Sequence, residues 1–295
     1  MTAPTAPSRL DELLERAWEA AADGPGGGEF GMAAATLDGE VHGVGEWERP
    51  FAIQSISKVF ALAVAVARGG AAVWDRVGRE PSGDPFNSLM QLERDQGIPR
   101  NPFINAGAIV VTDLLLALTG DASAAVRDVV REQSGDPTIE FDPAVVAAEA
   151  ARGDRNAAIA HLIAGLGNLD ASVERVLAHY FRQCALRMSC RDVALAATFL
   201  ARHGVGADGA PVLSRSDAKR INAVMLTCGT YDAAGEFAYR VGLPGKSGVS
   251  GGLLAIVPGR CALCAWSPPL DAAGNSIGAV AALDAFTTLS GWSVF

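Results

Sequence analysis

The chain has 295 residues, 49% of which are hydrophobic, and a formal net charge of -9 at pH 7. This apolar content is enough for a sizeable core and excludes a chain that is disordered throughout. No segment is rich in Lys and Arg, which argues against a protein that binds nucleic acid.

The first residues lack the basic segment and following apolar segment that are typical of a secretory signal. The apolar run at 59–67 is too short to span a bilayer. The five cysteines are odd in number and scattered, which suits a reducing compartment better than a disulfide framework. We therefore expect a cytoplasmic protein whose partner is neither a membrane nor a nucleic acid.

Five elements are predicted before residue 105, from apolar spacing and from turn residues. In order, they are an amphipathic helix, a Gly-rich loop, a β-hairpin around an Asp-Gly turn, an apolar helix and a long ordered loop. Connections as long as this last loop are uncommon unless they are functional. The elements span 8–23, 24–28, 30–37 with 40–45, the segment from Ser55 to Gly69, and 78–104.

The middle of the chain is predicted to be helical, and the end returns to strands. Asp121, Asp142, Asp154, Asp170 and Ser189 are suited to cap helix N-termini. The predicted helices span 106–118, 121–134, 142–152, 154–166, 170–182, 189–203 and 214–227. Three strands are then predicted at 237–241, 252–257 and 261–266, followed by a last helix at 276–290.

Strands at both ends and helices between them favour an α+β fold class. We predict a sheet domain formed by residues 1–70 and 210–295, with a helical domain formed by residues 71–209 inserted between its two parts. The two would make one catalytic unit, with the site at their junction, because clefts form where domains meet.

Ser55 and Lys58 are three residues apart at the start of the apolar helix, so their side chains are expected on one face. Burial lowers the pKa of a lysine, and its neutral amine can then accept the proton of a serine. Ser55 would also lie near backbone N–H groups that favour developing negative charge. The pair is a candidate nucleophile and base, although the same spacing recurs by chance in buried helices that start with polar residues.

Three other motifs match known patterns in their letters but not in their context. Residues 26–31 match G-x-G-x-x-G, but they follow a helix and open a strand, the reverse of a dinucleotide site. Residues 248–252 match G-x-S-x-G, but all four histidines precede Ser250, against the order of that hydrolase fold. Residues 261–264 match C-x-x-C, but on a strand the two thiols point to opposite faces. We predict no metal site.

Lys246-Ser247-Gly248 is a further candidate, because in proteins with a serine/lysine helix such a strand can line the opposite wall of the site. The alternative is a turn between a helix and a strand. A Ser–His–Asp catalytic site is not excluded by the sequence, because the three residues of a triad need only be close in space. The histidines, however, lie within or at the end of predicted helices, where structural roles are favoured.

Seven blocks of the sequence, taken together, resemble the bacterial glutaminases of the serine-dependent, β-lactamase-like family, from about residue 30 to the end. They are SISK (55–58), EPSGDPFNSL (80–89), NPFINAGAI (101–109), GDRN (153–156), MLTCGTYDAAGEFA (225–238), KSGV (246–249) and the ending WSPPLDAAGNS…GWSVF. The resemblance implies a serine β-lactamase/transpeptidase-like fold, with an antiparallel sheet from both termini and an inserted helical domain. It also implies hydrolysis of L-glutamine to L-glutamate and ammonia without a metal or organic cofactor, by a homodimer or homotetramer.

Carried over by matching positions, the resemblance implies Ser55 as the nucleophile, Lys58 as its activating partner and Tyr180 as a further catalytic residue. The backbone N–H groups of Ser55 and Val249 would hold the oxyanion. The implied substrate contacts are Ser55, Asn105, Glu149, Asn156, Tyr180, Tyr231 and Val249.

Glu149 would pair with the substrate ammonium, while Asn105, Asn156 and a tyrosine hydroxyl would donate to its carboxylate. Without the resemblance, a solvated helix charge is the favoured interpretation of Glu149, and helix caps are the favoured interpretation of the two asparagines.

The sequence departs from the family pattern in two places. The family commonly carries a Tyr-Ile-Pro segment before the first strand, whereas residues 17–31 here are glycine-rich and contain no tyrosine. Ser250 stands where glycine is usual. Two alternatives accompany the glutaminase reading. One is another amide or ester serine hydrolase of the penicillin-recognising fold, which would share Ser55, Lys58 and Lys246. The other is a catalytically weak homologue that binds glutamine or glutamate, which the missing tyrosine favours.

Overall fold

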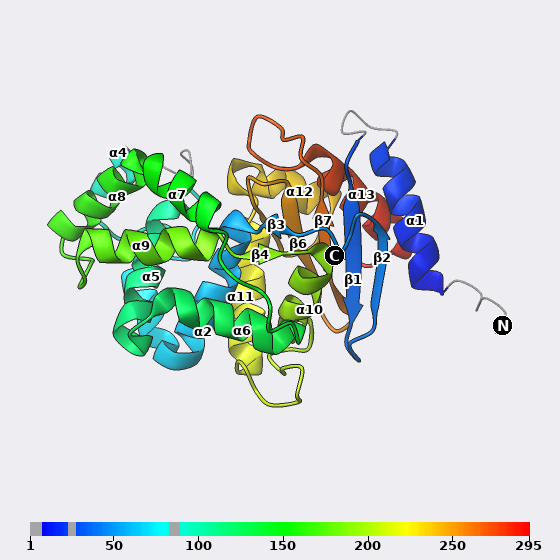
Figure 1. Ribbon diagram of the computed structural model, residues 1–295, viewed down its shortest axis with the longest axis horizontal. Coiled ribbons are helices and arrows are strands. Elements are labelled where there is room, and N and C mark those ends of the chain that lie inside the picture. Colours follow the sequence, from blue (N-terminus) through cyan, green and yellow to red (C-terminus); the bar gives the residue numbers. More distant parts are fainter. Residues whose placement is uncertain (1–7, 23–27, 83–88) are drawn as a thin grey trace.

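The computed structural model describes residues 8–22, 28–82 and 89–295, and its main sheet is antiparallel. The strand order is β2-β1-β7-β6-β5, so strands from the two ends of the chain lie side by side (Figure 1). The predicted α+β class, with a sheet built from both termini, is confirmed. The strands are β1 (Gly31–Thr36), β2 (Val41–Gly45), β5 (Gly245–Ser247), β6 (Gly252–Val257) and β7 (Cys261–Trp266).

The sheet separates two apolar cores. Successive residues of a strand point to opposite faces, so Met32 of β1 belongs to one core and Ala33 to the other. The smaller core lies under α1 (Arg9–Ala22) and α13 (Ile277–Ser290), which pack against each other on one side of the sheet (Figure 1). The spacing of Leu13, Leu14 and Ala17 in α1 suits this burial, as the amphipathic pattern predicts.

The opposite face of the sheet is covered by α10 (Cys190–Ala201), which packs on β1, β6 and β7. A capping box starts this helix. The Ser189 hydroxyl accepts from the Asp192 N–H, and the Asp192 carboxylate accepts from the Ser189 N–H at 3.0 Å. The larger core continues from this face into the helical region without a break.

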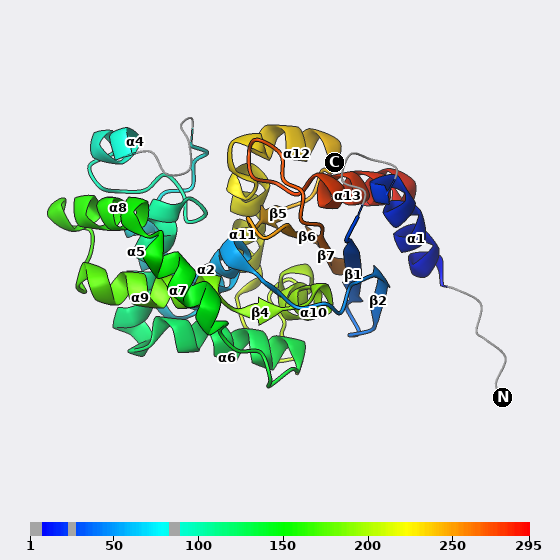
Figure 2. The same cartoon turned by 45° about the horizontal axis from the view of Figure 1, so that its top comes forward.

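Most of the helices between α2 and α9 gather at one end of the molecule, away from the sheet, whereas α6 extends back to α10 (Figures 1 and 2). A two-stranded sheet, β3 (Phe51–Ala52) with β4 (Arg187–Met188), runs between the two regions. The other helices are α2 (Ser57–Gly69), α3 (Val73–Arg76), α4 (Leu89–Arg94), α5 (Asn105–Thr119), α6 (Ala122–Ser134), α7 (Pro143–Ala151), α8 (Asp154–Gly165), α9 (Val173–Cys184), α11 (Arg215–Cys228) and α12 (Ala234–Arg240).

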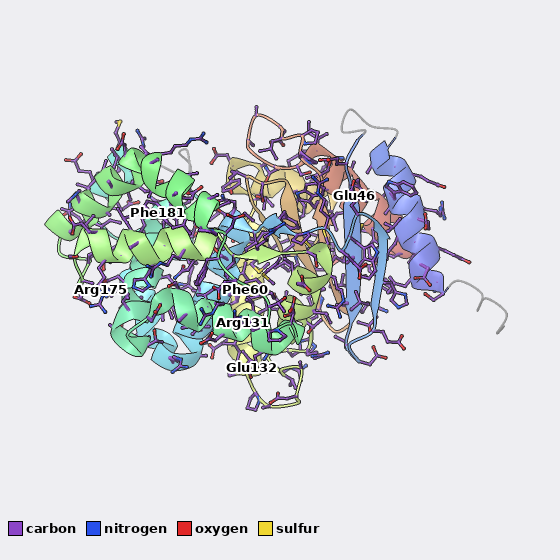
Figure 3. The ribbon with its side chains drawn as sticks, in the orientation of Figure 1. Glu46, Phe60, Arg131, Glu132, Arg175 and Phe181 are labelled. Carbon is purple, nitrogen blue, oxygen red and sulfur yellow. The ribbon has the colours of Figure 1, made fainter. Side chains whose placement is uncertain are left out.

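Helix α2 is apolar on nearly every side because it crosses the centre of the larger core, where Phe60 is fully buried (Figure 3). The helical stretch Gln54–Arg76 is long and apolar enough to cross a membrane, but 67% of its most apolar window is buried inside the protein. A core helix has these same properties.

Two predicted elements differ in the structure. Residues 237–240 form the end of α12 rather than a strand, and Val241 caps that helix. Phe237 and Val241 are buried and Tyr239 is exposed, which fits a helical period better than alternation. The long loop predicted at 78–104 contains helix α4. The hairpin and the remaining helices agree with prediction, whereas residues 24–27 of the predicted Gly-rich loop lie outside the described residues.

Asp121, Asp142 and Ser189 cap their helices as predicted, but Asp154 and Asp170 do not. Gly153 precedes α8, and Ser172 caps α9. Asp170 instead pairs with Arg76 at 2.8 Å, so its carboxylate ties α3 to the segment before α9.

The predicted division into domains 1–70 with 210–295 and 71–209 stays a prediction. Two observations bear on it. Helix α10, counted with the helical domain, packs on the sheet, and the larger core contains residues from both parts.

Candidate active site

Ser55 lies in a single 3-10 turn, Gln54–Ile56, that connects β3 to α2. The α-helix itself begins at Ser57, so Ser55 precedes the helix rather than forming its first turn. Gln54 has a φ of 49°, in the left-handed region that costs a non-glycine residue free energy. Ser55 is 9% exposed, so a small part of it stays accessible.

Lys58 is buried in the first turn of α2. Its ammonium donates to the Asn105 Oδ1 at 2.8 Å and to the Phe103 carbonyl at 3.3 Å. Burial lowers the pKa of Lys58 to about 8, and the negative charge of Glu149 opposes that shift. Its amine can therefore lose a proton in the neutral to mildly alkaline range, as a general base must.

A chain of hydrogen bonds extends from Lys58 across three helices. Asn105, the first residue of α5, donates through its Nδ2 to the Oδ1 of Asn156 on α8 at 3.0 Å. Neither asparagine is a cap, because Ile104 and Gly153 occupy those positions, which overturns the alternative drawn from sequence alone.

Glu149 of α7 is half-buried and hydrogen-bonded to the turn that carries Ser55. The Gln54 amide donates to its Oε1 at 3.1 Å. The carboxylate is therefore not a freely solvated helix charge. Because Gln54 directly precedes Ser55, this bond holds an anionic group beside the candidate nucleophile.

Tyr231 approaches Ser55 from the other side, in the turn before α12. Its φ of 57° is also left-handed. Its hydroxyl donates to the Ser247 carbonyl at 3.3 Å. Burial raises the pKa of Tyr231, whereas the interactions of its hydroxyl with Ser55 and Ser247 lower it. Tyr231 is thus the tyrosine in contact with Ser55.

Tyr180 stands on α9 at the back of the site, with its ring centroid 5.9 Å from the Lys58 ammonium. Burial raises its pKa well above the ordinary value, and the neighbouring Cys184 and Glu149 raise it further. It is therefore held as the neutral phenol.

Sequence reasoning missed Cys184, a buried thiol that interacts with Tyr180 and Ser57. Burial raises its pKa to about 12, so it is an uncharged neighbour of Lys58. Only its position four residues after Tyr180, one helical turn along α9, could have indicated it.

Val249 lies at the mouth of the site and is 48% exposed. It follows β5, and the nearby loop carrying Gly274 passes close to both Val249 and Tyr231. The carbonyl of Ser250 accepts from the Trp266 indole at 2.9 Å, while the Ser250 hydroxyl has no partner among the described residues.

The structure thus groups the predicted residues around Ser55, with Val249 at the rim. Such a group can position a serine, remove its proton and bind a zwitterionic head. Within the described residues, no cluster of three or more His, Cys, Asp or Glu could hold a metal ion. Cys261 and Cys264 point into opposite cores, as predicted for C-x-x-C on a strand.

A Ser–His–Asp grouping does occur on α6 and α9, but it is not a catalytic triad. The Nδ1 of His179 lies 2.9 Å from the Ser123 hydroxyl and 3.2 Å from Asp121. A triad needs the two partners on different ring nitrogens, and here both meet the same one. These contacts stabilise the N-terminus of α6.

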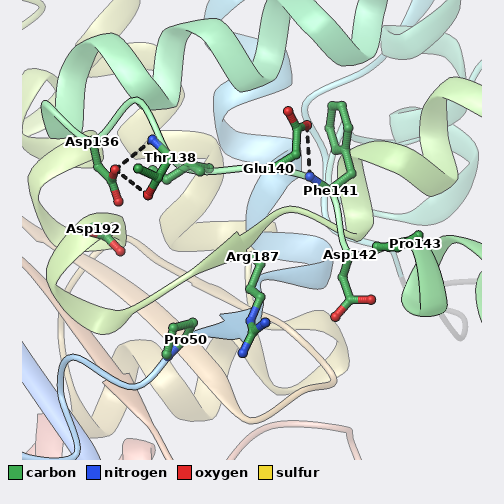
Figure 4. Close-up of a pocket in the computed structure, with 10 residues that line it drawn as sticks. Pro50, Asp136, Thr138, Glu140, Phe141, Asp142, Pro143, Arg187 and Asp192 are labelled. Carbon is green, nitrogen blue, oxygen red and sulfur yellow. Dashed lines mark hydrogen bonds between the residues drawn. The ribbon is translucent and has the colours of Figure 1, made fainter.

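A separate cavity of about 540 Å³ lies beside the β3–β4 pair (Figure 4). Arg187 and Asp142 lie on its wall, together with Pro50 and Asp192. Its carboxylates already serve the fold, since Asp142 and Asp192 complete helix caps. None of the residues lining it belongs to the group around Ser55.

Comparison with known proteins agrees with this geometry. The glutaminase family model matches residues 26–295. A glutaminase of Streptomyces coelicolor is 64% identical over 266 residues, covering 90% of this chain and 87% of that protein. A glutaminase of Ralstonia nicotianae is 53% identical over 268 residues, covering 90% of this chain and 88% of that protein.

Solved structures give the same result. The probable glutaminase ybaS has a TM-score of 0.91 at 33% identity and covers 99% of both chains. A Bacillus glutaminase has a TM-score of 0.88 at 34% identity, covering 97% of this chain and 99% of that chain. This chain therefore belongs to the glutaminase family.

Proposed function

We propose that the protein hydrolyses L-glutamine to L-glutamate and ammonia, with Ser55 as the nucleophile. Membership of the glutaminase family supports the substrate. The observation that carries the mechanism is the buried amine of Lys58, three residues from Ser55, whose pKa is lowered to about 8. It provides a base without any metal or organic cofactor.

In the first half-reaction, the Ser55 oxygen attacks the side-chain carboxamide carbon of glutamine. Its proton passes to Lys58, directly or through the Tyr231 hydroxyl. The backbone N–H groups of Ser55 and Val249 stabilise the oxyanion. The C–N bond then breaks. The leaving nitrogen takes the proton back from Lys58, directly or through the Tyr231 hydroxyl, and departs as ammonia, and a γ-glutamyl ester of Ser55 remains.

In the second half-reaction, water adds to the ester carbonyl carbon. Lys58 accepts a proton from the water, directly or through the Tyr231 hydroxyl, and the C–O bond to Ser55 breaks. The serine oxygen recovers its proton, glutamate leaves, and the starting protonation state returns.

Glutamine also presents a zwitterionic head, which the second group of residues suits. Glu149 pairs with the ammonium, and the amides of Asn105 and Asn156 donate to the carboxylate. Tyr180, kept neutral by burial, provides a further donor.

The direct test compares ammonia and glutamate release by the wild type, Ser55→Ala and Ser57→Ala. We expect Ser55→Ala to lower kcat by about a thousandfold or more, because removing a nucleophile usually costs that much. Ser57 donates to the Gln54 carbonyl at 2.7 Å and serves as the matched serine. Its alanine variant should stay within about tenfold of wild type, a loss of about 1.4 kcal/mol.

Three results would redirect the proposal. Equal losses in both serine variants would remove Ser55 as the nucleophile. A wild type that binds glutamine, seen as a raised melting temperature, but does not hydrolyse it would favour the binding homologue. A wild type that hydrolyses other amides or esters but not glutamine would favour another hydrolase of the same fold.

We further propose that the protein acts in the cytoplasm as a homodimer or homotetramer. The assembly follows from the family resemblance, and the compartment follows from the scattered free thiols, which suit a reducing environment. Light scattering on purified protein decides the assembly, and fractionation of the source cells decides the compartment.

A further inference from the structure

The chain has three lysines, Lys58, Lys219 and Lys246. Lys219 is exposed on α11, whereas Lys58 and Lys246 are both buried beside the candidate site. The mechanism above uses Lys58 and leaves Lys246 without a role. A lysine that is 0% exposed is costly to bury and calls for a physical explanation.

Lys246 does not reach toward Ser55 through any hydrogen bond in the described part of the chain. Its ammonium donates to the Gly229 carbonyl at 2.8 Å and to the Ser247 carbonyl at 2.7 Å. The nitrogen also lies 4.3 Å from the ring centroid of Tyr231. An ammonium has three donors, and two carbonyl oxygens and an aromatic face suit all three.

Tyr231 is the residue that these contacts hold. Its left-handed φ of 57° costs on the order of 1–3 kcal/mol and persists only where the surroundings impose it. The Tyr231 hydroxyl donates to the Ser247 carbonyl, the same group that Lys246 binds. Gly229, the other acceptor, stands two residues before Tyr231. The ammonium therefore connects the residue just before the tyrosine turn to β5, and it shares the Ser247 carbonyl with the Tyr231 hydroxyl.

The two buried lysines also interact electrostatically. Burial lowers the pKa of Lys246 well below its ordinary value, and the positive charge of Lys58 lowers it further. The titratable groups that interact with Lys246 are Lys58 on α2, Cys184 on α9 and Tyr231.

We propose that Lys246 is a positioning residue, which holds the Tyr231 ring and its hydroxyl against Ser55 rather than contacting the substrate. The proposal rests on the function proposed above for its effect on turnover, but the placement of Tyr231 can be measured without turnover.

A double-mutant cycle tests whether Lys246 acts through Tyr231. We expect Lys246→Met and Tyr231→Phe each to lower kcat/KM for glutamine by about a hundredfold, the lower end for a lost proton-transfer group. The double variant should be no slower than Tyr231→Phe alone, within about threefold. Losses that multiply would overturn the proposal. Lys219→Met, the same change on the surface, should match the wild type.

A conservative variant supplies a readout that a merely structural role would not change. Lys246→Gln keeps N–H donors for the Gly229 and Ser247 carbonyls, so it should retain more kcat/KM for glutamine than Lys246→Met. Equal losses in the two variants would contradict the positioning role. If Lys246→Met does not fold, Lys246→Gln takes its place in the double-mutant cycle.

Placement of the ring is measured by fluorine NMR of protein labelled with 3-fluorotyrosine. The chain has three tyrosines, and Tyr239, which is 87% exposed, serves as an internal reference. Lys246→Met should shift and broaden the Tyr231 resonance and leave Tyr239 unchanged. An unchanged Tyr231 resonance would overturn the proposal even in an active enzyme. If glutamine is not hydrolysed but the resonance moves, the proposed function fails and this inference stands.

Discussion

Burial changes the pKa of Lys58 more than any single interaction partner does. Its two acceptors are a neutral amide oxygen and a backbone carbonyl, neither of which offsets the loss of water around a full charge. The pKa of about 8 follows from that imbalance. The carboxylate whose charge opposes this lowering of the pKa, Glu149, accepts a hydrogen bond from Gln54.

We predict that kcat/KM for glutamine falls about tenfold per pH unit below pH about 8, because only the neutral amine of Lys58 accepts the Ser55 proton. The folded-state pKa is depressed, so the active form predominates above it and is lost below it. Initial rates in overlapping buffers check this, with circular dichroism to show that the protein stays folded. A flat profile between pH of about 6 and 9 would remove Lys58 as the base.

A second prediction concerns Glu149. Replacing it by Gln keeps its shape and its acceptor for Gln54 but removes the charge for the substrate ammonium. We expect KM for glutamine to rise by about ten- to a hundredfold, since a hydrogen bond to a charged group is worth about 1.5–3 kcal/mol. Glu132→Gln on the exposed face of α6 is the matched control (Figure 3). Equal KM values in both variants would exclude Glu149 from the ammonium site.

At the scale of elements, the close approach of α11 to β5 positions the part of the site that contains Tyr231. A Cβ at Gly229 would lie 1.8 Å from the Gly245 carbonyl oxygen. The same Gly229 offers its own carbonyl to Lys246. Helix and strand can approach this closely only because Gly229 lacks a side chain.

We predict that Gly229→Ala lowers the free energy of unfolding by about 3 kcal/mol or more, because backbone must move to admit the methyl group. Gly235→Ala is the matched control: it lies within α12, has an ordinary φ, and its added Cβ would meet nothing within 4 Å. That change should stabilise by about 0.4–1 kcal/mol. Urea unfolding of both variants checks the contrast, and similar values would contradict the proposed crowding.

The predicted strand at 237–241 was wrong because the same apolar residues fit both the two-residue period of a strand and the period of a helix. In 237–241, the alternation of Phe237, Tyr239 and Val241 fits a strand, but Phe237 and Val241 are also one helical turn apart. Only the environment of Tyr239, which is 87% exposed, separates the two readings, and that environment is tertiary. The hairpin at β1 and β2 was predictable because its Asp-Gly turn is local.

At the scale of the whole molecule, the larger core unites the sheet face with the helices, and the candidate site lies at its edge. All five cysteines are free and buried in this core or in the smaller one. Burial raises the pKa of Cys184 and of Cys261 to about 12. Such thiols are poorly reactive because the thiolate is the attacking form.

We predict that none of the five thiols reacts with a disulfide reagent such as DTNB within minutes in the native protein, whereas all five react in denaturant. A cysteine introduced by Ser216→Cys on the exposed start of α11 should react at once and calibrates the assay. Rapid labelling of a native thiol would show that the core opens more readily than this packing implies.

The sequence by itself determined the fold class, most of the elements and the family, because these depend on periodicity, turn residues and ordered motifs. It also indicated Ser55 and Lys58 through their spacing. Only the tertiary structure decided that Tyr231 contacts Ser55, that Cys184 adjoins Lys58 and that the Lys246 ammonium lies over the Tyr231 ring. The physical reason is that burial, left-handed backbone angles and contacts between distant segments arise from packing, which no local pattern encodes.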